Sequence, residues 1–314
     1  MRRFLRGRDD SPLQVAGVLV LSLALSGLLV LAGRGLAPQT AAPSASSAAS
    51  DPLDAYRGLG SWVSIYDARA WADPEAAVAD MSGHGVQTLF IQTGNSNSEG
   101  VVYKPAGQEL FIRAAHARGM KVVAWYLPEM ADMAHDYDRI ASAIGFRTAD
   151  GQTFDSFAVD IESTKIKSID ARNTAVRVFT SMVRGLVGDS YVLGAIVPSP
   201  VGVAKRTGFW NDFPYGAVAA DFQVLLPMGY YTYHGKGPAA VAADVTESVR
   251  MIRATPGCET VPIHFIGGLA AKTTPAEVGA FAAATTASGC VGASIYSWSG
   301  TTSADWEALR PVAR

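Results

Sequence analysis

The sequence has few cysteines and little charge. Two cysteines occur in 314 residues, and charged residues make up only 17% of the chain. Two thiols are too few for a disulfide-rich scaffold or for a four-ligand zinc site built on thiolates. A net charge of −2 gives no general attraction to nucleic acid, so we expect no nucleic-acid partner. Because 49% of the residues are hydrophobic, the composition is not that of a disordered chain either.

Motifs for cofactors and metals are also missing. No predicted strand is followed by a G-x-G-x-x-G or G-x-x-x-x-G-K-[ST] phosphate loop, and neither H-E-x-x-H nor G-x-S-x-G occurs. The five histidines are scattered. His264 falls early in a predicted strand, where we expect a hydrogen-bonded core residue, and His234 lies in a loop. The sequence therefore predicts no metal site and no cofactor.

The first 34 residues predict a membrane address. Residues 15–32 carry no charge, and as a helix they would span about 27 Å, close to the hydrocarbon thickness of a bilayer. Arg2, Arg3, Arg6 and Arg8 precede this run, which places the N-terminus in the cytoplasm. Residues 1–34 are thus either a basic tip with a transmembrane anchor or a cleaved signal peptide. In both cases we expect the remainder outside the cytoplasm, either held at the cell membrane by a single span or secreted.

Two further regions follow. Residues 35–55 are rich in Ala, Ser, Pro and Thr and predict a flexible linker. In residues 56–314 an apolar run, a polar loop and an amphipathic segment repeat eight times. Near-continuous apolar runs are typical of strands buried on both faces of a parallel sheet. The eight runs are 61–67, 86–93, 121–127, 157–162, 192–197, 222–230, 262–267 and 291–298.

Helix signals separate these runs. Asp73-Pro74 begins one predicted helix, and Thr274 with Glu277 three residues later forms a capping box before another. Glycines follow the predicted helices at 109–118, 170–184, 238–254 and 275–288 within a few residues. Eight strand–helix units in about 255 residues predict a single (β/α)8 TIM barrel of the α/β class. A doubly wound open sheet is the alternative, although it lacks a phosphate loop.

The two cysteines fall at corresponding places in this scheme. Cys258 precedes the seventh predicted strand and Cys290 precedes the eighth. Neighbouring strands of a barrel begin at the same rim, and disulfides persist outside the cytoplasm. We therefore predict a disulfide between Cys258 and Cys290, with two free thiols as the alternative.

Barrel enzymes carry their active sites at the C-terminal ends of the strands. Strand four is the most informative, because Ala158, Asp160 and Glu162 alternate and so share one face. Two carboxylates side by side near a barrel mouth repel each other and lose hydration, which raises the pKa of at least one of them. A raised pKa suits a general acid. An ion pair with Lys165 or Lys167 is the structural alternative.

Strand four also carries a family resemblance. Asp155-Ser-Phe-Ala158-Val-Asp160-Ile-Glu162 resembles the D-x-x-D-x-D-x-E signature of family 18 chitinase-like glycoside hydrolases, with Ala158 in place of the second acid. Met228-Gly229-Tyr230 resembles the M-x-Y of strand six in that family. A strand-four D-x-E is also similar to that of family 25 lysozyme-like barrels, in which Asp67 would supply a further acid.

The resemblance implies roles for these residues. Glu162 would protonate the glycosidic oxygen, Asp160 would orient the 2-acetamido group of the substrate, and Tyr230 would hydrogen-bond that group. The implied activity is hydrolysis of an amino-sugar polysaccharide by a monomer outside the cytoplasm. The alternative is a catalytically inactive carbohydrate-binding barrel of the cell envelope, suggested by Ala158. Residues at other strand ends predicted to bind the saccharide are Asp67, Gln92, Asn95, Trp125, Glu129, Met228, Tyr231 and Trp298.

Overall fold

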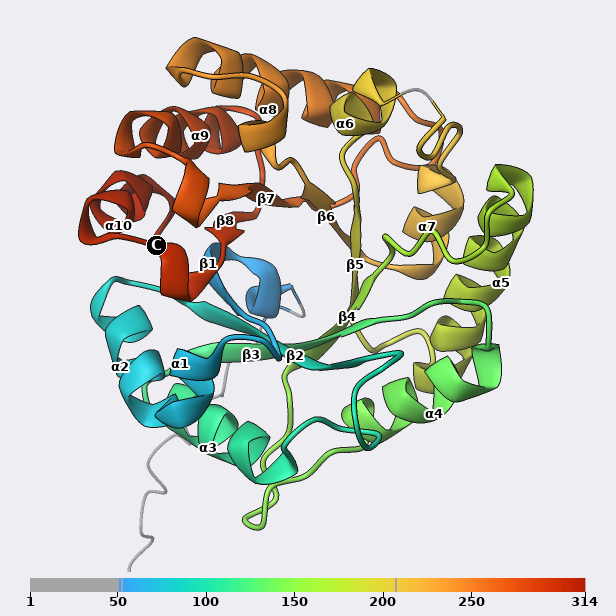
Figure 1. Cartoon of the computed structure of the whole chain (residues 1–314), viewed down its shortest axis with the longest axis vertical. Helices are drawn as coiled ribbons and strands as arrows, with labels where there is room; N and C mark the ends of the chain where they lie inside the picture. Colours follow the sequence, from blue (N-terminus) through green and yellow to red (C-terminus); the bar gives the residue numbers. More distant parts are fainter. Residues whose placement is uncertain (1–50, 52, 207, 314) are drawn as a thin grey trace, which may run out of the picture. The chain divides into compact units, whose positions relative to one another are not determined.

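The predicted single barrel is confirmed. A computed structural model of the chain describes residue 51 and residues 53–206 and 208–313. Within them, eight parallel strands pair in the order of the sequence, and β8 closes on β1 (Figure 1). The predicted membrane segment at residues 15–32 and most of the predicted linker lie outside the described residues. In the described part, no helix is both long and apolar enough to cross a bilayer.

Strands and helices alternate around the ring in Figure 1. The strands are β1 (Gly58–Val63), β2 (Thr88–Asn95), β3 (Lys121–Leu127), β4 (Ser156–Asp160), β5 (Leu193–Pro198), β6 (Val224–Met228), β7 (His264–Leu269) and β8 (Gly292–Tyr296). The helices are α1 (Ala68–Ala72), α2 (Pro74–Gly83), α3 (Pro105–His116), α4 (Met133–Ile144), α5 (Ile169–Val187), α6 (Pro200–Lys205), α7 (Tyr215–Asp221), α8 (Pro238–Arg253), α9 (Pro275–Ala287) and α10 (Ser303–Leu309). Short 3-10 turns are η1 (Asp54–Tyr56), η2 (Tyr231–Tyr233), η3 (Ala270–Lys272), η4 (Trp298–Gly300) and η5 (Arg310–Val312).

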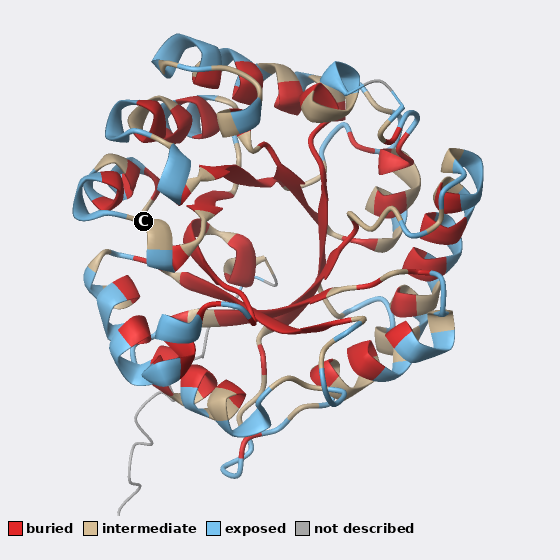
Figure 2. Cartoon of the chain, viewed as in Figure 1, coloured by how far each residue is buried: buried red, intermediate tan, exposed pale blue. Residues whose placement is uncertain are grey.

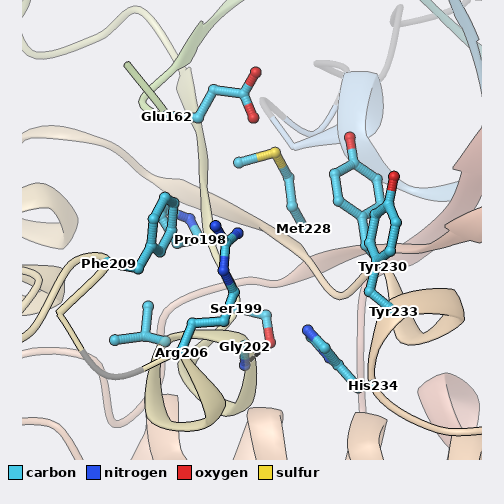
Figure 3. Close-up of a pocket in the computed structure, with 11 residues that line it drawn as sticks. Glu162, Pro198, Ser199, Gly202, Arg206, Phe209, Met228, Tyr230, Tyr233 and His234 are labelled. Atoms are coloured by element: carbon cyan, nitrogen blue, oxygen red, sulfur yellow. Dashed lines mark hydrogen bonds between the residues drawn. The ribbon is translucent and has the colours of Figure 1, made fainter. Parts of the chain in front are cut away.

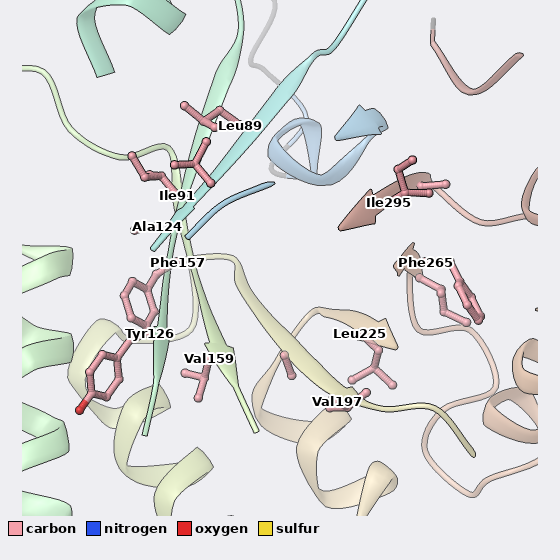
Figure 4. Close-up of a cluster of buried hydrophobic side chains, with 14 of the residues drawn as sticks. Leu89, Ile91, Ala124, Tyr126, Phe157, Val159, Val197, Leu225, Phe265 and Ile295 are labelled. Atoms are coloured by element: carbon pink, nitrogen blue, oxygen red, sulfur yellow. The ribbon is translucent and has the colours of Figure 1, made fainter. Parts of the chain in front are cut away.

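The strands are buried on both faces, as their apolar runs predict (Figure 2). Alternate residues point outward and pack beneath the helices, and Figure 4 shows a part of this layer. Residues of β4 illustrate the alternation, because Phe157 and Val159 belong to the outer layer whereas Ala158 belongs to the cluster inside the barrel. Whether a strand side chain points into the barrel or toward the helices therefore follows from its position in the apolar run.

Aromatic side chains fill the barrel interior. Trp62 stacks on Phe90 with ring centroids 4.3 Å apart, and Trp125 meets Trp62 edge-on at 5.8 Å. The turn η1, drawn in blue inside the ring of strands in Figure 1, contributes Tyr56, whose ring is fully buried. Gly60 leaves room for this packing, since a Cβ there would lie 2.6 Å from the ring of Phe90. Gly60 belongs to β1, which begins at Gly58, three residues before the predicted start at Ser61.

A chain of buried hydrogen bonds crosses the interior. The hydroxyl of Tyr56 lies 2.7 Å from Ser156 Oγ, and its carbonyl oxygen lies 2.8 Å from Nδ1 of His264. Nε2 of His264 lies 3.0 Å from Ser294 Oγ, which accepts the indole N–H of Trp62 at 2.8 Å. Burial lowers the pKa of His264 to about 4, so its ring is neutral. The prediction that His264 is a hydrogen-bonded core residue is confirmed.

Helix starts follow the predicted capping signals. Asp73 accepts the backbone N–H of Ala76 at the start of α2, and Thr274 and Glu277 form a complete capping box at α9. The sequence did not delimit α1, α4, α6, α7 and α10, although side chains also cap all of these helices except α7.

The predicted disulfide is wrong, because Cys258 and Cys290 are both free thiols. Cys258 is fully buried and close to Tyr215 of α7, whereas Cys290 lines a separate cavity with Thr285 and Val312. The two residues precede neighbouring strands, but their side chains pack against different helices. Burial raises the pKa of Cys290 to about 12, which leaves the thiol protonated and unreactive.

Gly292 gives a test of the interior packing. A Cβ at this position would collide with the backbone carbonyl of Tyr56 and lie 2.7 Å from that of Gly58. We expect Gly292→Ala to destabilise the fold by about 3 kcal/mol, a fall in Tm of about 6–12 °C. Gly279→Ala in α9 is the control, since no atom lies within 4 Å of its added Cβ. There the lower entropy of the unfolded chain should stabilise by about 0.5–1 kcal/mol. Equal Tm values for the two variants, measured by calorimetry, would contradict this account.

Candidate active site

Two acids meet at the C-terminal end of β4. Asp160 is the last residue of the strand and is 6% exposed, while Glu162 follows two residues later and reaches a cavity. Ala158 and Asp160 lie on the inward face, as the alternation of the strand predicts. Lys165 does not pair with either acid; it lies 3.3 Å from Glu129. Neither Asp160 nor Glu162 forms an ion pair with the described residues.

Burial controls the protonation of this pair. It raises the pKa of Asp160 well above its usual value, and the charge of Glu162 raises it further. Burial also raises the pKa of Glu162. Oδ1 of Asp160 is buried and has no hydrogen-bond partner in the described part of the chain. The pair therefore holds a proton at pH values at which an ordinary carboxyl group has lost it.

Tyr230 lies beside the two acids. Its backbone is left-handed, with φ 38° and ψ 46°, an uncommon conformation for a residue with a side chain. Burial raises the pKa of Tyr230, and the charges of Asp160 and Glu162 raise it further. Its hydroxyl thus stays protonated and can donate a hydrogen bond. The ring of Tyr296 of β8 packs against Tyr230, with the two ring centroids 6.4 Å apart.

A cavity of about 540 Å³ opens above the pair (Figure 3). Its size is within the range of sites that hold small ligands. Residues from the ends of β4, β5 and β6 and from the loops that follow line it. They are Glu162, Pro198, Ser199, Gly202, Val203, Arg206, Phe209, Met228, Tyr230, Tyr233 and His234. Of the predicted site residues, Glu162, Tyr230 and Met228 therefore share one cavity.

Two lining residues, Arg206 and Phe209, had no signal in the sequence, whereas His234 lies in a loop, as the sequence predicts. Arg206 follows α6, and its guanidinium carbon lies 4.1 Å from the ring centroid of Phe209. His234 follows η2, and its Nδ1 atom lies 3.4 Å from Oδ1 of Asp244 in α8. These residues come from loops whose path no motif predicts.

Two predicted saccharide contacts are wrong. Tyr231 is 1% exposed, and its hydroxyl lies 3.0 Å from Oγ1 of Thr273 in the layer outside the barrel. The indole N–H of Trp298 donates to Asp80 of α2 at 2.8 Å, so its ring also packs outside the barrel. The strand ends at Tyr296, and the turn η4 that follows sends Trp298 toward α2. Alternation cannot be extended past the end of a strand.

The other predicted contacts serve the barrel rim and do not line this cavity. Asp67 caps α1 by accepting the N–H of Ala70, and Gln92 accepts the N–H of Ile65. The side chain of Asn95 donates to the hydroxyl of Tyr66 at 2.9 Å. Glu129 forms its ion pair with Lys165, as given above, and Trp125 is buried inside the barrel. Each of these side chains has a contact within the fold, but the indole N–H of Trp125 and Oδ2 of Asp67 have no hydrogen-bond partner among the described residues.

No cluster of three or more His, Cys, Asp or Glu side chains that could hold a metal ion occurs among the described residues. The chemical groups of this site are a carboxyl pair with raised pKa values, a tyrosine hydroxyl, one guanidinium and one imidazole.

Comparisons with known proteins agree with this fold. No protein-family model and no curated protein sequence matches the chain. Among solved structures, an endo-β-1,4-mannanase from Thermotoga petrophila is similar with a TM-score of 0.60 at 10% identity, covering 82% of this chain and 76% of the mannanase. A chitinase from Chromobacterium violaceum has a TM-score of 0.59 at 13% identity, covering 82% of this chain and 99% of the chitinase.

A third similar structure is a family 18 chitinase from Cycas revoluta in complex with (GlcNAc)4. Its TM-score is 0.59 at 9% identity, and the match covers 82% of this chain and 98% of the chitinase. The predicted resemblance to glycoside hydrolase barrels of the family 18 type is confirmed in the fold. At these identities the similarity establishes the shared barrel and no more.

Replacing Asp160 tests the electrostatics of the pair. Since the pKa of Asp160 is raised in the folded state, the folded protein binds a proton that the unfolded chain releases. Stability is therefore lost as the pH rises from the unfolded value toward the folded one. We expect the Tm of Asp160→Asn, relative to wild type, to increase between pH 4 and pH 8 by a few °C. The exposed Asp138→Asn in α4 is the control and should show no such trend. A pH-independent difference for Asp160→Asn, followed by thermal denaturation, would show that the pair is not strained by its charge.

Proposed function

We propose that this chain is an extracytoplasmic glycoside hydrolase that cleaves a polysaccharide containing 2-acetamido sugars. The observation that carries the proposal is the position of Glu162, which reaches a cavity at the C-terminal strand ends while burial raises its pKa. A general acid must hold a proton at the pH at which it works and lie within reach of the substrate. Similar folds in chitinases and a mannanase support this reading.

The proposed reaction uses a group of the substrate as its nucleophile. Glu162 donates its proton to the glycosidic oxygen, and the bond from C1 to that oxygen breaks. The carbonyl oxygen of the 2-acetamido group then bonds to C1, forming a cyclic intermediate that water opens. Substrate assistance of this kind needs no second enzymatic nucleophile. It agrees with the end of β7, where Gly267 and Gly268 supply no carboxylate.

Asp160 and Tyr230 would act on the acetamido group. The Oδ1 atom of Asp160, which lacks a partner in the described structure, could accept the amide N–H, and the Tyr230 hydroxyl could donate to the carbonyl oxygen. The rings of Tyr230 and Tyr233 stand nearly perpendicular at 6.5 Å and offer apolar faces for a sugar ring. The cavity thus has an acid, a tyrosine hydroxyl and an aromatic wall, and Asp160 lies buried two residues before the acid.

A carbohydrate-binding barrel without catalysis is the second candidate. Ala158 occupies a fully buried inward position directly below Asp160, where the family 18 signature carries an acid. Without that acid, no side chain can share a proton with Asp160 from below. The two candidates differ in turnover, not in binding.

Glu162→Gln separates them. We expect the variant to release reducing ends from N-acetylated chitin oligosaccharides at least about 100-fold more slowly than wild type, because the amide cannot donate the required proton. Deacetylated oligosaccharides should be poor substrates of the wild type, since they lack the nucleophile. Glu247→Gln on the surface of α8 makes the same chemical change away from the cavity and is the matched control.

Three results are informative. Loss of turnover only in Glu162→Gln supports the hydrolase. Saccharide binding without turnover in wild type and variant alike supports the inactive barrel. Full activity of Glu162→Gln would show that another residue is the acid.

The proposed location depends on residues 1–34. A charge-free run at residues 15–32 after four arginines favours a single span with the barrel outside, or secretion if the segment is cleaved. We expect alkaline phosphatase fused after Arg314 to be active in cells, because this reporter folds only outside the cytoplasm. The same fusion without residues 1–34 should be inactive. Equal activity of the two fusions would contradict the proposed export signal.

A further inference from the structure

The cavity beside Glu162 contains a positive charge that the proposed reaction does not use. Arg206 lies at the end of α6, and Figure 3 shows its guanidinium extending into the cavity. The ring of Phe209 supports it from one side at 4.1 Å. Among the described residues, no acid pairs with Arg206 and no side chain or backbone oxygen accepts its guanidinium N–H groups. Its donors are therefore free for a ligand.

Two other basic side chains near Arg206 lie close to an acidic residue. Nζ of Lys205 lies 3.2 Å from Oδ1 of Asp244, and this carboxylate is almost fully buried behind the cavity. Nδ1 of His234 lies 3.4 Å from the same oxygen. The imidazole also lies over Gly202, where an added Cβ would be 3.0 Å from Cε1 and 3.3 Å from Nε2. Asp244 thus forms an ion pair with Lys205 and lies close to His234, whereas Arg206 has no acidic partner among the described residues.

We propose that Arg206 and His234 bind a carboxylate on the sugar next to the scissile bond, so that the substrate is an acidic amino-sugar polysaccharide. The proposal rests on the proposed function, because it places this carboxylate in the cavity of the general acid. A guanidinium presents two parallel N–H groups that match the two oxygens of a carboxylate. A ring held beneath the guanidinium reduces its freedom and leaves its outer edge toward the cavity.

The charge count of the cavity favours a monoanion. Arg206 supplies one formal charge that no described acid balances, whereas the carboxylate of Asp244 lies against both Lys205 and His234. Glu162 is the acidic residue among those that line the cavity. A phosphate monoester carries about −1.5 to −2 charges at pH 7 and would leave negative charge unbalanced close to Glu162. A neutral sugar would leave the guanidinium of Arg206 unpaired.

Three β-1,4-linked oligosaccharides of equal length test the proposal. The first alternates N-acetylglucosamine with its 3-O-lactyl ether, which carries the carboxylate. The second is the same compound with each lactyl carboxyl reduced to an alcohol, and the third is a chitin oligosaccharide. Binding is measured by calorimetry in the Glu162→Gln background, in which the substrate is not consumed. Turnover is measured with the otherwise wild-type chain.

We expect the carboxylate compound to bind about 10–100-fold more tightly than the reduced one, as one charge-assisted pair predicts. Arg206→Gln should remove this difference while leaving affinity for the reduced compound within about two-fold. Arg206→Lys keeps the charge but lacks the paired donors, and should recover only part of the preference. Lys167→Gln, an exposed lysine in the loop after β4 that does not line the cavity, is the matched control for a general loss of positive charge.

The outcomes distinguish the two proposals. A carboxylate preference that depends on Arg206, without turnover of any compound, supports the subsite and overturns the hydrolase. Turnover lost in Glu162→Gln but equal for the charged and reduced compounds overturns the subsite alone. An equal loss of preference in Lys167→Gln, or tighter binding of a phosphorylated oligosaccharide than of the carboxylate compound, also overturns it. Absence of binding to all three compounds overturns both.

Discussion

A closed barrel of eight strands must fill its own interior, and much of this structure follows from that constraint. Here the filling is aromatic: Trp62 and Phe90 stack near the middle, and Tyr56 enters from η1. The polar atoms brought inside with these rings are satisfied by one chain of hydrogen bonds through His264 and Ser294. Buried polar atoms without partners would cost free energy, so the rings and the hydrogen bonds are parts of one solution. Glycines on β1, β5 and β8 give the space that these rings need.

The same filling sets the chemistry at the mouth of the barrel. Asp160 lies at the top of an interior closed by rings, so it has little contact with water and no partner for Oδ1 in the described structure. Glu162 lies two residues further along the chain and lines the cavity. One carboxyl is therefore held in the apolar interior and the other at its boundary; burial raises the pKa of both, and the charge of Glu162 raises that of Asp160 further. The free energy that this arrangement costs is the reason to read it as a site and not as part of the packing.

The sequence predicted those parts of the molecule in which a regular repeat sets the place of each residue, namely the strand–helix repeat and the alternation of side chains along a strand. Eight apolar runs predicted eight strands, and the alternation in β4 placed Ala158 and Asp160 inward. Prediction failed beyond the ends of the strands, where side chains no longer alternate between two faces. Tyr231 follows Tyr230, whose left-handed backbone redirects the chain, and Trp298 begins a 3-10 turn that packs against α2. It also failed for Cys258 and Cys290, because corresponding positions before neighbouring strands do not imply that side chains point toward one another. Arg206 could not be found at all, since its place depends on the path of a loop.

This division between strands and loops corresponds to a division of labour in the site. Strand β4 holds Asp160, and Glu162 follows it by two residues, so the two carboxyl groups interact at the end of one strand. The loops after β5 and β6 supply the guanidinium, the imidazole and the outer aromatic ring that line the rest of the cavity. Loop residues can change without loss of the barrel core, so one acid pair can serve different saccharides. For this chain, then, the reaction type is argued most firmly from β4, and the identity of the substrate from the loops that no sequence period describes.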